Sequence, residues 1–284
     1  MQVITQLSDM RDYQRRLNQQ GIEIGLVPTM GALHEGHLSL VRTSLAQANQ
    51  TIVSLFLNSL QFDSSEDLMQ YPRNEAKDLA LLEEIGVDIV FMAQADELYP
   101  KGFDTYVEVS QLSEGLCGAE RPRHFRGVTT VLCKLFHIVQ PTWAYFGQKD
   151  FQQLRVIQKM VSDLNMNVEL VVCPTIREES GLAMSSRNQR LNDEQKKHSA
   201  GIYRALCDSL QKSELGLLKK DLKEALLSIP ELKINYLEVV DYHTLLPVDD
   251  LESVCIVAVA VFMDEVRLID HVERRINDTR NAKI

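Results

Sequence analysis

The 284-residue sequence contains no hydrophobic run long enough to cross a membrane and no secretory start. Its most apolar stretch, residues 254–263, has about half the length that a membrane-spanning helix needs. Residues 1–6 lack the basic start and the apolar run of a secretory signal. We therefore expect a cytoplasmic protein that does not bind a membrane.

Paired cysteines and an excess of positive charge are also missing. The five cysteines are scattered and none forms a Cys-x-x-Cys pair, which argues against a disulfide framework and against a thiolate zinc site. The formal net charge is −10, whereas nucleic-acid-binding proteins usually carry a basic face. Positive charge is concentrated only locally, in Arg-Pro-Arg-His-Phe-Arg at 121–126, so we expect a small anionic ligand and no nucleic acid.

The first 175 residues alternate short apolar runs with segments of helical periodicity. The runs predict strands at 22–27, 51–57, 88–92, 143–146 and 168–172. The periodic segments predict helices at 36–48, 74–85, 128–139 and 151–164. Strands that alternate with such helices form parallel sheets through right-handed crossovers, so we expect a doubly wound, Rossmann-like α/β domain over residues 1–175.

The pattern changes near residue 175. A polar loop at 177–188 is followed by predicted helices at 193–211 and 217–228, and then by strand-like runs at 234–240, 254–262 and 266–271. Helices followed by strands predict a separate, smaller α+β domain over residues 176–284.

The segment 27–37, Val-Pro-Thr-Met-Gly-Ala-Leu-His-Glu-Gly-His, joins a predicted strand to a helix. Ligands of open α/β sheets bind at such strand ends, and the N–H groups of a helix start favour an anion. His34 and His37 share one side of a helical turn and can donate to phosphate oxygens, while Gly36 lets a ligand approach the backbone. The alternatives are a metal site, although the His-Glu-x-x-His spacing is absent, or two polar residues that open a helix. Neither a Walker loop nor a Gly-x-Gly-x-x-Gly motif is present.

Two other segments offer groups for a phosphate. Lys149 follows the predicted strand 143–146 and opens a helix, where its ammonium group can reach a phosphate. Ser185, Ser186 and Arg187 lie in the polar loop and form either a flexible phosphate clamp or part of a solvated linker.

Neutral amides stand near two strand ends. Asn58 and Gln61 follow the predicted strand 51–57, where an amide can recognise a hydroxyl or a carboxylate without adding charge. The alternative is ordinary loop and cap chemistry. For Gln153 that alternative is a capping box with Asp150.

Together these segments resemble a known family. Residues 28–37 are similar to the His-x-Gly-His signature of the nucleotidyltransferase superfamily, which includes class I aminoacyl-tRNA synthetases. The ordered set of motifs resembles the pantothenate synthetases, or pantoate–β-alanine ligases, in particular. Besides 27–37, the matching motifs are Gln61-Phe62, Tyr71-Pro72-Arg73, His124-Phe125-Arg126-Gly127-Val128, Lys134-Leu135-Phe136, Gln140-Pro141, Phe146-Gly147, Lys149-Asp150, Gln152-Gln153-Leu154 and Met184-Ser185-Ser186-Arg187-Asn188.

The resemblance implies an ATP-dependent condensation of pantoate with β-alanine, in pantothenate and coenzyme A biosynthesis, through an enzyme-bound pantoyl-adenylate. It implies Mg²⁺ with the ATP and a cytoplasmic homodimer. The implied ATP-binding residues are Met30, Gly31, Ala32, Leu33, His34, Glu35, Gly36, His37, Gly147, Gln148, Lys149, Asp150, Ile176, Met184, Ser185, Ser186 and Arg187. The implied catalytic residues, which would face the phosphates, are His34, His37, Lys149, Ser185, Ser186 and Arg187, with an acid role for His37. Gln61, Gln153 and Asn58 would bind pantoate and β-alanine.

The sequence departs from the family pattern at several positions. Lys77 stands where many members have an Asp, which leaves Asp78 as the candidate metal ligand. The other departures are Ser59 for a Pro, Arg123 for a Gly, Gln148 for a Glu and Ser180 for an Asp.

Water would hydrolyse the mixed anhydride, so we expect a closing lid, formed by the C-terminal domain and the loop at 185–187. Two other hypotheses are a plain nucleotidyltransferase and a non-catalytic nucleotide-binding module. The presence of His37, Lys149 and Arg187 argues against the second of these.

Overall fold

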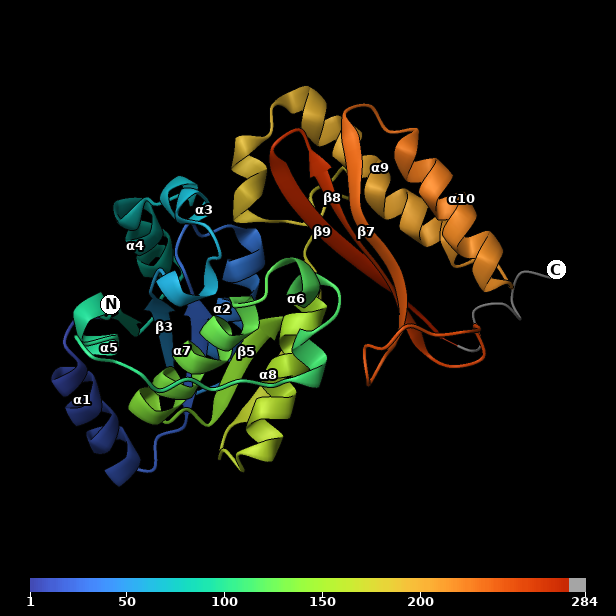
Figure 1. Cartoon of the computed structure of the whole chain (residues 1–284). Helices are drawn as coiled ribbons and strands as arrows, with labels where there is room; N and C mark the ends of the chain where they lie inside the picture. The colour runs from blue at the N-terminus through green and yellow to red at the C-terminus, as the bar shows by residue number, and fades with distance from the viewer. Residues whose placement is uncertain (276–284) are drawn as a thin grey trace. The chain divides into compact units, whose positions relative to one another are not determined.

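A computed structural model describes residues 1–275 of the chain (Figure 1). Contacts within the chain divide it into two compact units. The first unit consists of Met1–Ser110, Arg121–Gln148 and Gln153–Pro174. The second consists of Gln111–Glu120, Lys149–Gln152 and the residues from Thr175 onward. Lys149 therefore packs with the second unit although it precedes residue 175. The predicted domain boundary and the lid role of residues 176–284 stay predictions.

The first unit is built on a six-stranded parallel sheet in the order β1-β4-β3-β2-β5-β6. Its strands are β1 (Gln2–Ile4), β2 (Ile24–Thr29), β3 (Gln50–Leu55), β4 (Ile89–Phe91), β5 (Trp143–Gly147) and β6 (Glu169–Cys173). In this sheet β2 lies between β3 and β5. The strand order thus reverses between β2 and β5, and open α/β sheets bind ligands beside the carboxyl ends of such a strand pair. The predicted doubly wound sheet is confirmed.

Helices cover both faces of this sheet. They are α1 (Leu7–Gln19), α2 (Glu35–Gln47), α4 (Glu75–Glu84), α7 (His124–Val139) and α8 (Phe151–Asp163). Leu26 and Ile52 are fully buried on the face covered by α1, α7 and α8. Val27 and Val53, one position further along each strand, are fully buried on the face covered by α2 and α4. Because successive strand residues point to opposite faces, a strand covered on both sides is a continuous apolar run.

Several short elements, and one long helix, were not predicted. The short ones are β1, α3 (Ser65–Gln70), α5 (Ala95–Leu98), α6 (Cys117–Glu120) and the 3₁₀ turns η1 (Ser59–Gln61), η2 (Gln111–Ser113), η3 (Gln148–Asp150) and η4 (Ser186–Arg190). The long one is α1, whose buried residues are Met10, Gln14 and Leu17. Gln14 donates to the side-chain oxygen of Gln140 at 2.9 Å, so a polar residue fills one of the three buried positions of a helix that has few apolar residues.

The second unit contains a three-stranded antiparallel sheet in the order β7-β8-β9. Its strands are β7 (Leu232–Asp241), β8 (Cys255–Met263) and β9 (Val266–Arg274), and its long helices are α9 (Asp193–Ser209) and α10 (Leu215–Leu227). Both helices lie along one side of the sheet (Figure 1), and Leu206 and Leu222 share a core with Val257. The predicted α+β character is confirmed. Within residues 1–275, no helix is both long and apolar enough to span a membrane.

Candidate active site

The loop that follows β2 is held in place by Asp78 of α4. One oxygen of its carboxylate accepts the backbone N–H of Ala32 and the other accepts that of Leu33, each at 2.8 Å. Gly31 has a φ of +83°, and a Cβ added there would lie 3.0 Å from Asp78 Oδ2. Asp78 is only 3% exposed. A buried carboxylate that accepts two backbone amides therefore shapes the start of the predicted nucleotide loop.

His34, the N-cap of α2, and His37, in its first turn, cap this helix reciprocally. The N–H of Gly36 donates to Nδ1 of His34 at 3.1 Å, and the N–H of His34 donates to Nδ1 of His37 at 3.4 Å. Their ring centroids are 4.1 Å apart. Because Nδ1 accepts in each ring, the neutral imidazoles carry their protons on Nε2. Each ring can thus donate from Nε2 at a helix start that itself favours an anion.

Asp78, the candidate metal ligand, already accepts a backbone hydrogen bond at each of its carboxylate oxygens. Mg²⁺ in nucleotide sites is bound through one or two carboxylates together with substrate phosphates. Among the described residues, no group of three or more His, Cys, Asp or Glu side chains could hold a metal ion. The carboxylate fits a structural role, and its assignment as a metal ligand stays a prediction.

Asn58 holds the side chain of Gln61 in a fixed position. Its Nδ2 donates to Gln61 Oε1 at 2.9 Å and to the carbonyl of Gly127 at 3.0 Å. Its Oδ1 accepts the Tyr99 hydroxyl at 2.8 Å, and burial raises the pKa of Tyr99, which keeps that donor protonated. Since the Gln61 oxygen already accepts from Asn58, the amide NH₂ of Gln61 is the group that it can offer to a carboxylate.

Gly127 allows α7 to pack directly on η1. A Cβ at this position would lie 2.4 Å from the carbonyl carbon and oxygen of Leu60 and 2.5 Å from the backbone nitrogen of Gln61. On the same side, His124 Nδ1 lies 2.9 Å from the Gln61 carbonyl oxygen. Sequence reasoning quoted Gly127 only as part of a motif. A glycine directly before the predicted apolar helix 128–139, in what proves to be the first turn of α7, was the signal for this close approach.

The basic segment at 121–126 is partly neutralised by nearby carboxylates. Arg121 Nε lies 3.5 Å from Asp63 Oδ2, and Arg121 Nη2 lies 3.6 Å from Asp67 Oδ2. The backbone N–H of Arg123 also donates to Asp63 at 3.2 Å. These arginines brace the η1 region, so the local excess of positive charge is smaller than the sequence alone indicates.

Lys149 lies in η3, beside its neighbour Asp150, in the second unit. The two side chains are 3.5 Å apart, and the Lys149 side chain is 18% exposed. His271 of β9 is close to both, and its ring centroid lies 5.3 Å from that of Phe151. Burial lowers the pKa of His271, while the neighbouring carboxylates of Asp270 and Asp150 act in the opposite direction.

Met184 directly precedes the predicted phosphate clamp, and its backbone N–H donates to the carbonyl of Ile176 at 3.0 Å. Ser185 is the N-cap of η4, and its hydroxyl accepts the N–H of Arg187 at 3.3 Å. Ser186 is buried. The second unit therefore brings Ile176 next to the 184–187 segment, although the sequence separates them.

Gln152 and Gln153 have different environments. Gln152 is buried, donates to the carbonyls of Leu112 and Gly115, and accepts the N–H of Cys117 at 2.9 Å. Its role is to hold the 111–120 segment. Gln153 is half-buried in the first unit, and its contact with pantoate stays a prediction.

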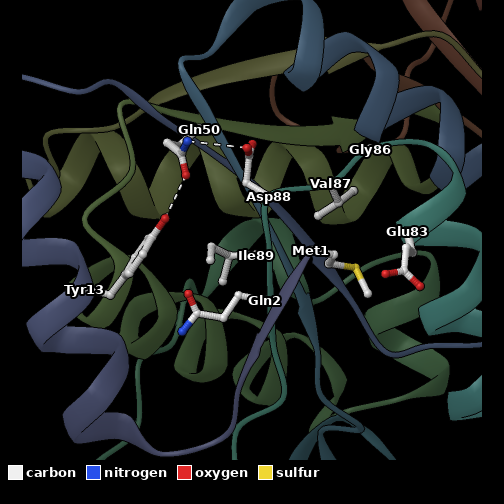
Figure 2. A pocket seen from close by; sticks show the side chains of 9 residues that line it. All are labelled: Met1, Gln2, Tyr13, Gln50, Glu83, Gly86, Val87, Asp88 and Ile89. Atoms are coloured by element: carbon white, nitrogen blue, oxygen red, sulfur yellow. Dashed lines mark hydrogen bonds between the residues drawn. The ribbon is translucent and has the colours of Figure 1, made fainter.

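A hollow of about 570 Å³ lies elsewhere in the first unit, at the amino ends of β1, β3 and β4 (Figure 2). There Tyr13 donates to Gln50 at 2.8 Å, and Gln50 donates to Asp88 at 3.4 Å. Asp88 also accepts the N–H of Thr51 at 2.8 Å. These polar groups satisfy one another and lie at the sheet edge opposite the histidines, so the hollow is not the candidate site.

A doubly wound parallel sheet, with paired histidines capping the helix after β2, places the chain in the Rossmann-like α/β class, with a helix start whose N–H groups favour an anion. Comparison with known proteins makes the assignment specific. The family model described as pantoate-beta-alanine ligase matches residues 2–273. The chain belongs to the pantoate–β-alanine ligase family, and its activity is the ligation of pantoate with β-alanine in pantothenate biosynthesis.

Similarity to individual relatives extends over nearly the whole chain. The chain is 48% identical over 276 residues to the pantothenate synthetase of Thermosipho africanus, covering 95% of this chain and 99% of the relative. The crystal structure of pantothenate synthetase from Thermus thermophilus matches with a TM-score of 0.89 at 42% identity, covering 96% and 99% of the two chains. The ligase from Francisella tularensis, complexed with Beta-gamma ATP and Beta-alanine, matches with a TM-score of 0.81 at 31% identity, covering 96% and 97%.

Proposed function

We propose that the chain activates pantoate with ATP and forms an enzyme-bound pantoyl-adenylate. A carboxylate oxygen of pantoate attacks the α-phosphorus, and the bond from that phosphorus to the bridging oxygen of pyrophosphate breaks. The neutral amine of β-alanine then attacks the acyl carbon, loses a proton and expels AMP, which leaves pantothenate. ATP and β-alanine are proposed as ligands because the Francisella relative is described in complex with an ATP compound and β-alanine.

The observation that carries this proposal is the reciprocal cap of His34 and His37. The first step brings two anions together, and donors aimed at the developing charge on the phosphate lower its barrier. Backbone hydrogen bonds fix the tautomer of both histidine rings, so each ring presents an Nε2–H donor. These donors need no rearrangement as the negative charge on the phosphate grows. We assign His37 an acid role toward the phosphates, with His34 as a second donor.

The nucleotide site as a whole is proposed from three segments and one further residue. Residues 30–37 and 147–150 line ATP, together with Ile176 and the 184–187 segment. Lys149, Ser185, Ser186 and Arg187 contribute donors and positive charge to the phosphates. The 185–187 segment and the C-terminal domain serve as the lid that excludes water from the mixed anhydride.

Pantoate is assigned to Gln61 and Gln153, with Gln61 also near β-alanine. Asn58 acts through Gln61. The Asn58 amide donates to the side-chain oxygen of Gln61, which leaves the NH₂ group of Gln61 as the donor for the substrate. A neutral amide holds a carboxylate without the tight ground-state binding that a Lys would add, and uniform binding does not accelerate the chemical step.

A magnesium ion that accompanies ATP would neutralise charge on the pyrophosphate group, and phosphate oxygens would be its principal ligands. Asp78 is the candidate protein ligand, although its backbone hydrogen bonds favour a structural role. The cytoplasmic location and the homodimer also stay predictions.

The proposal is tested by incubating the enzyme with ATP and pantoate, with and without β-alanine, and detecting products by mass spectrometry. We expect pantoyl-adenylate and pyrophosphate when β-alanine is absent, and pantothenate and AMP when it is present. Release of pyrophosphate without pantoate would favour a plain nucleotidyltransferase. Pantothenate formed without any adenylate in single-turnover samples would contradict the proposed intermediate.

A further inference from the structure

The second unit contains a buried, bidentate ion pair outside the proposed set of ligand-binding residues. Arg177 Nη1 lies 2.6 Å from Asp270 Oδ2, and Arg177 Nη2 lies 2.9 Å from Asp270 Oδ1. The Asp270 side chain is 6% exposed and that of Arg177 is 18% exposed. Arg177 follows the predicted ATP-binding residue Ile176, whereas Asp270 lies on β9, 93 positions later.

Arg177 connects three parts of this unit. Its guanidinium carbon lies 3.4 Å from the centroid of the Tyr203 ring on α9. Its Nη1 also donates to the carbonyl of Gly181 at 3.1 Å. Burial acts to lower the pKa of Arg177, but the carboxylate of Asp270 outweighs it and raises that pKa, so the guanidinium stays charged. One side chain thus ties a turn of the loop both to the sheet and to a helix.

The turn that Arg177 holds leads directly into the proposed phosphate segment. Residues 176–184 form a tight hairpin, in which Arg177 bridges to Ala183 and the N–H of Glu178 donates to the carbonyl of Leu182 at 2.8 Å. Gly181, with a φ of +95°, makes the reversal. Ser185 follows at the end of the hairpin.

Asn188 closes the other side of the segment. Its Nδ2 donates to the carbonyl of Ala183 at 3.1 Å and to Glu178 Oε1 at 2.8 Å. The segment 185–187 therefore lies between the hairpin that Arg177 holds and Asn188, which is hydrogen-bonded to the same hairpin. A buried ion pair is weak evidence for stability, because desolvation offsets its attraction, but a bidentate pair restricts geometry strongly.

We propose that Arg177, through Asp270, is a positioning residue for ATP, because it sets the hairpin that places Ser185, Ser186 and Arg187 against the phosphates. This inference rests on the proposed phosphate-binding role of the 185–187 segment. A positioning residue acts on ligand geometry, so its loss affects ATP kinetics selectively. Loss of a purely structural residue would reduce stability and leave the KM values of the folded enzyme alone.

The test compares variants of the full chain by steady-state kinetics and thermal unfolding. Arg177→Met combined with Asp270→Leu removes both charges, so that no buried carboxylate is left unpaired. We expect this double variant to raise the KM for ATP about tenfold, since displacements of about 1 Å can cost more than that in rate. The KM for pantoate should change less than about twofold, and the Tm should remain near that of the parent.

Two further variants keep the inference falsifiable. Arg177→Lys retains the positive charge but not the bidentate geometry, and we expect its KM for ATP to lie between those of the parent and the double variant. This single variant replaces the double variant in the test if the double variant does not fold. Leu222→Ala is the control, because it removes a fully buried side chain of the same unit and lowers the Tm without touching the hairpin. Its KM for ATP should equal that of the parent.

The inference is overturned if the double variant and Arg177→Lys both keep the parental KM for ATP, or if every KM rises in parallel with the fall in Tm. Arg187→Met distinguishes failure of the inference about Arg177 from failure of the proposed function. If Arg187→Met leaves ATP kinetics unchanged, the phosphate role of the segment itself is wrong. If only Arg187→Met raises the KM for ATP, the positioning role of Arg177 is wrong.

Discussion

The carboxylate of Asp78 accepts the backbone N–H of Leu33, 45 positions earlier in the chain, at 2.8 Å. A second hydrogen bond reaches the neighbouring residue, Ala32. This pair of contacts joins α4 to the loop after β2, and it explains how a short, glycine-containing loop is held in one conformation beside the histidines.

Asp78→Asn should loosen this loop. The amide replaces one acceptor oxygen by a donor, so one buried N–H loses its partner, at a cost of about 1–3 kcal/mol in the free energy of unfolding. We expect a lower Tm and a higher KM for ATP, with an unchanged Mg²⁺ concentration for half-maximal rate. Lys77→Ala, at an exposed position of the same helix, is the control and should behave like the parent. A large shift in the Mg²⁺ requirement of Asp78→Asn would instead favour a metal-ligand role.

Gly127→Ala should push α7 away from η1. The added Cβ would meet the Leu60 backbone at 2.4 Å, and backbone cannot move aside as a flexible side chain can. We expect a loss of about 1–3 kcal/mol in unfolding free energy, together with a higher KM for pantoate. Chemical denaturation and initial-rate kinetics measure the two effects.

Gly216→Ala provides the matched control for this substitution. Its Cβ would have only an ordinary contact, 3.5 Å from Glu214 Oε1, at an exposed helix position. Alanine is favoured over glycine in helices by about 0.5–1 kcal/mol, so this variant should be at least as stable as the parent. Equal behaviour of the two glycine variants would show that the contact between Gly127 and Leu60 is unimportant.

The capping and donor roles of His34 can be separated by two substitutions. Serine is a good N-cap, so His34→Ser should keep the Tm near the parental value, whereas His34→Ala should lose about 1 kcal/mol of stability. Both variants lack the Nε2–H donor, so both should reduce kcat, on the order of 10²-fold for loss of one preorganised donor. Thermal unfolding and single-turnover adenylate formation test this. A His34→Ser variant with full activity would show that His34 is only a cap.

Stability should fall at mildly acidic pH because of His271. Its pKa in the folded protein is lowered from the ordinary value of 6.5, so the unfolded chain binds more protons than the folded chain as the pH falls through that value. The contribution of neutral His271 to the free energy of unfolding is therefore complete above pH 6.5 and is lost below it. The free energy of unfolding then falls by up to about 1.4 kcal/mol per pH unit. His271→Gln, which does not titrate, should show a flatter dependence of Tm on pH between 7.5 and 5.5. Identical slopes for the parent and the variant would contradict this.

The predicted elements match the observed ones where burial leaves a clear pattern in the sequence. The continuous apolar runs of β2 and β3 reflect a sheet covered on both faces, and the predicted strands overlap the observed ones. The prediction failed for α1, where Gln14 occupies a core position through its bond to Gln140, more than a hundred residues away. Such a polar core residue is visible only once the two helices are packed together.

By itself, the sequence determined the fold class, the family and the histidine pair after β2, because periodicity, motif order and a three-residue spacing can all be seen in the linear order of residues. Only the tertiary structure decided which groups Asp78 and Arg177 contact. Their partners, Leu33 and Asp270, lie 45 and 93 positions away, and packing rather than chain connectivity brings those groups within hydrogen-bonding distance.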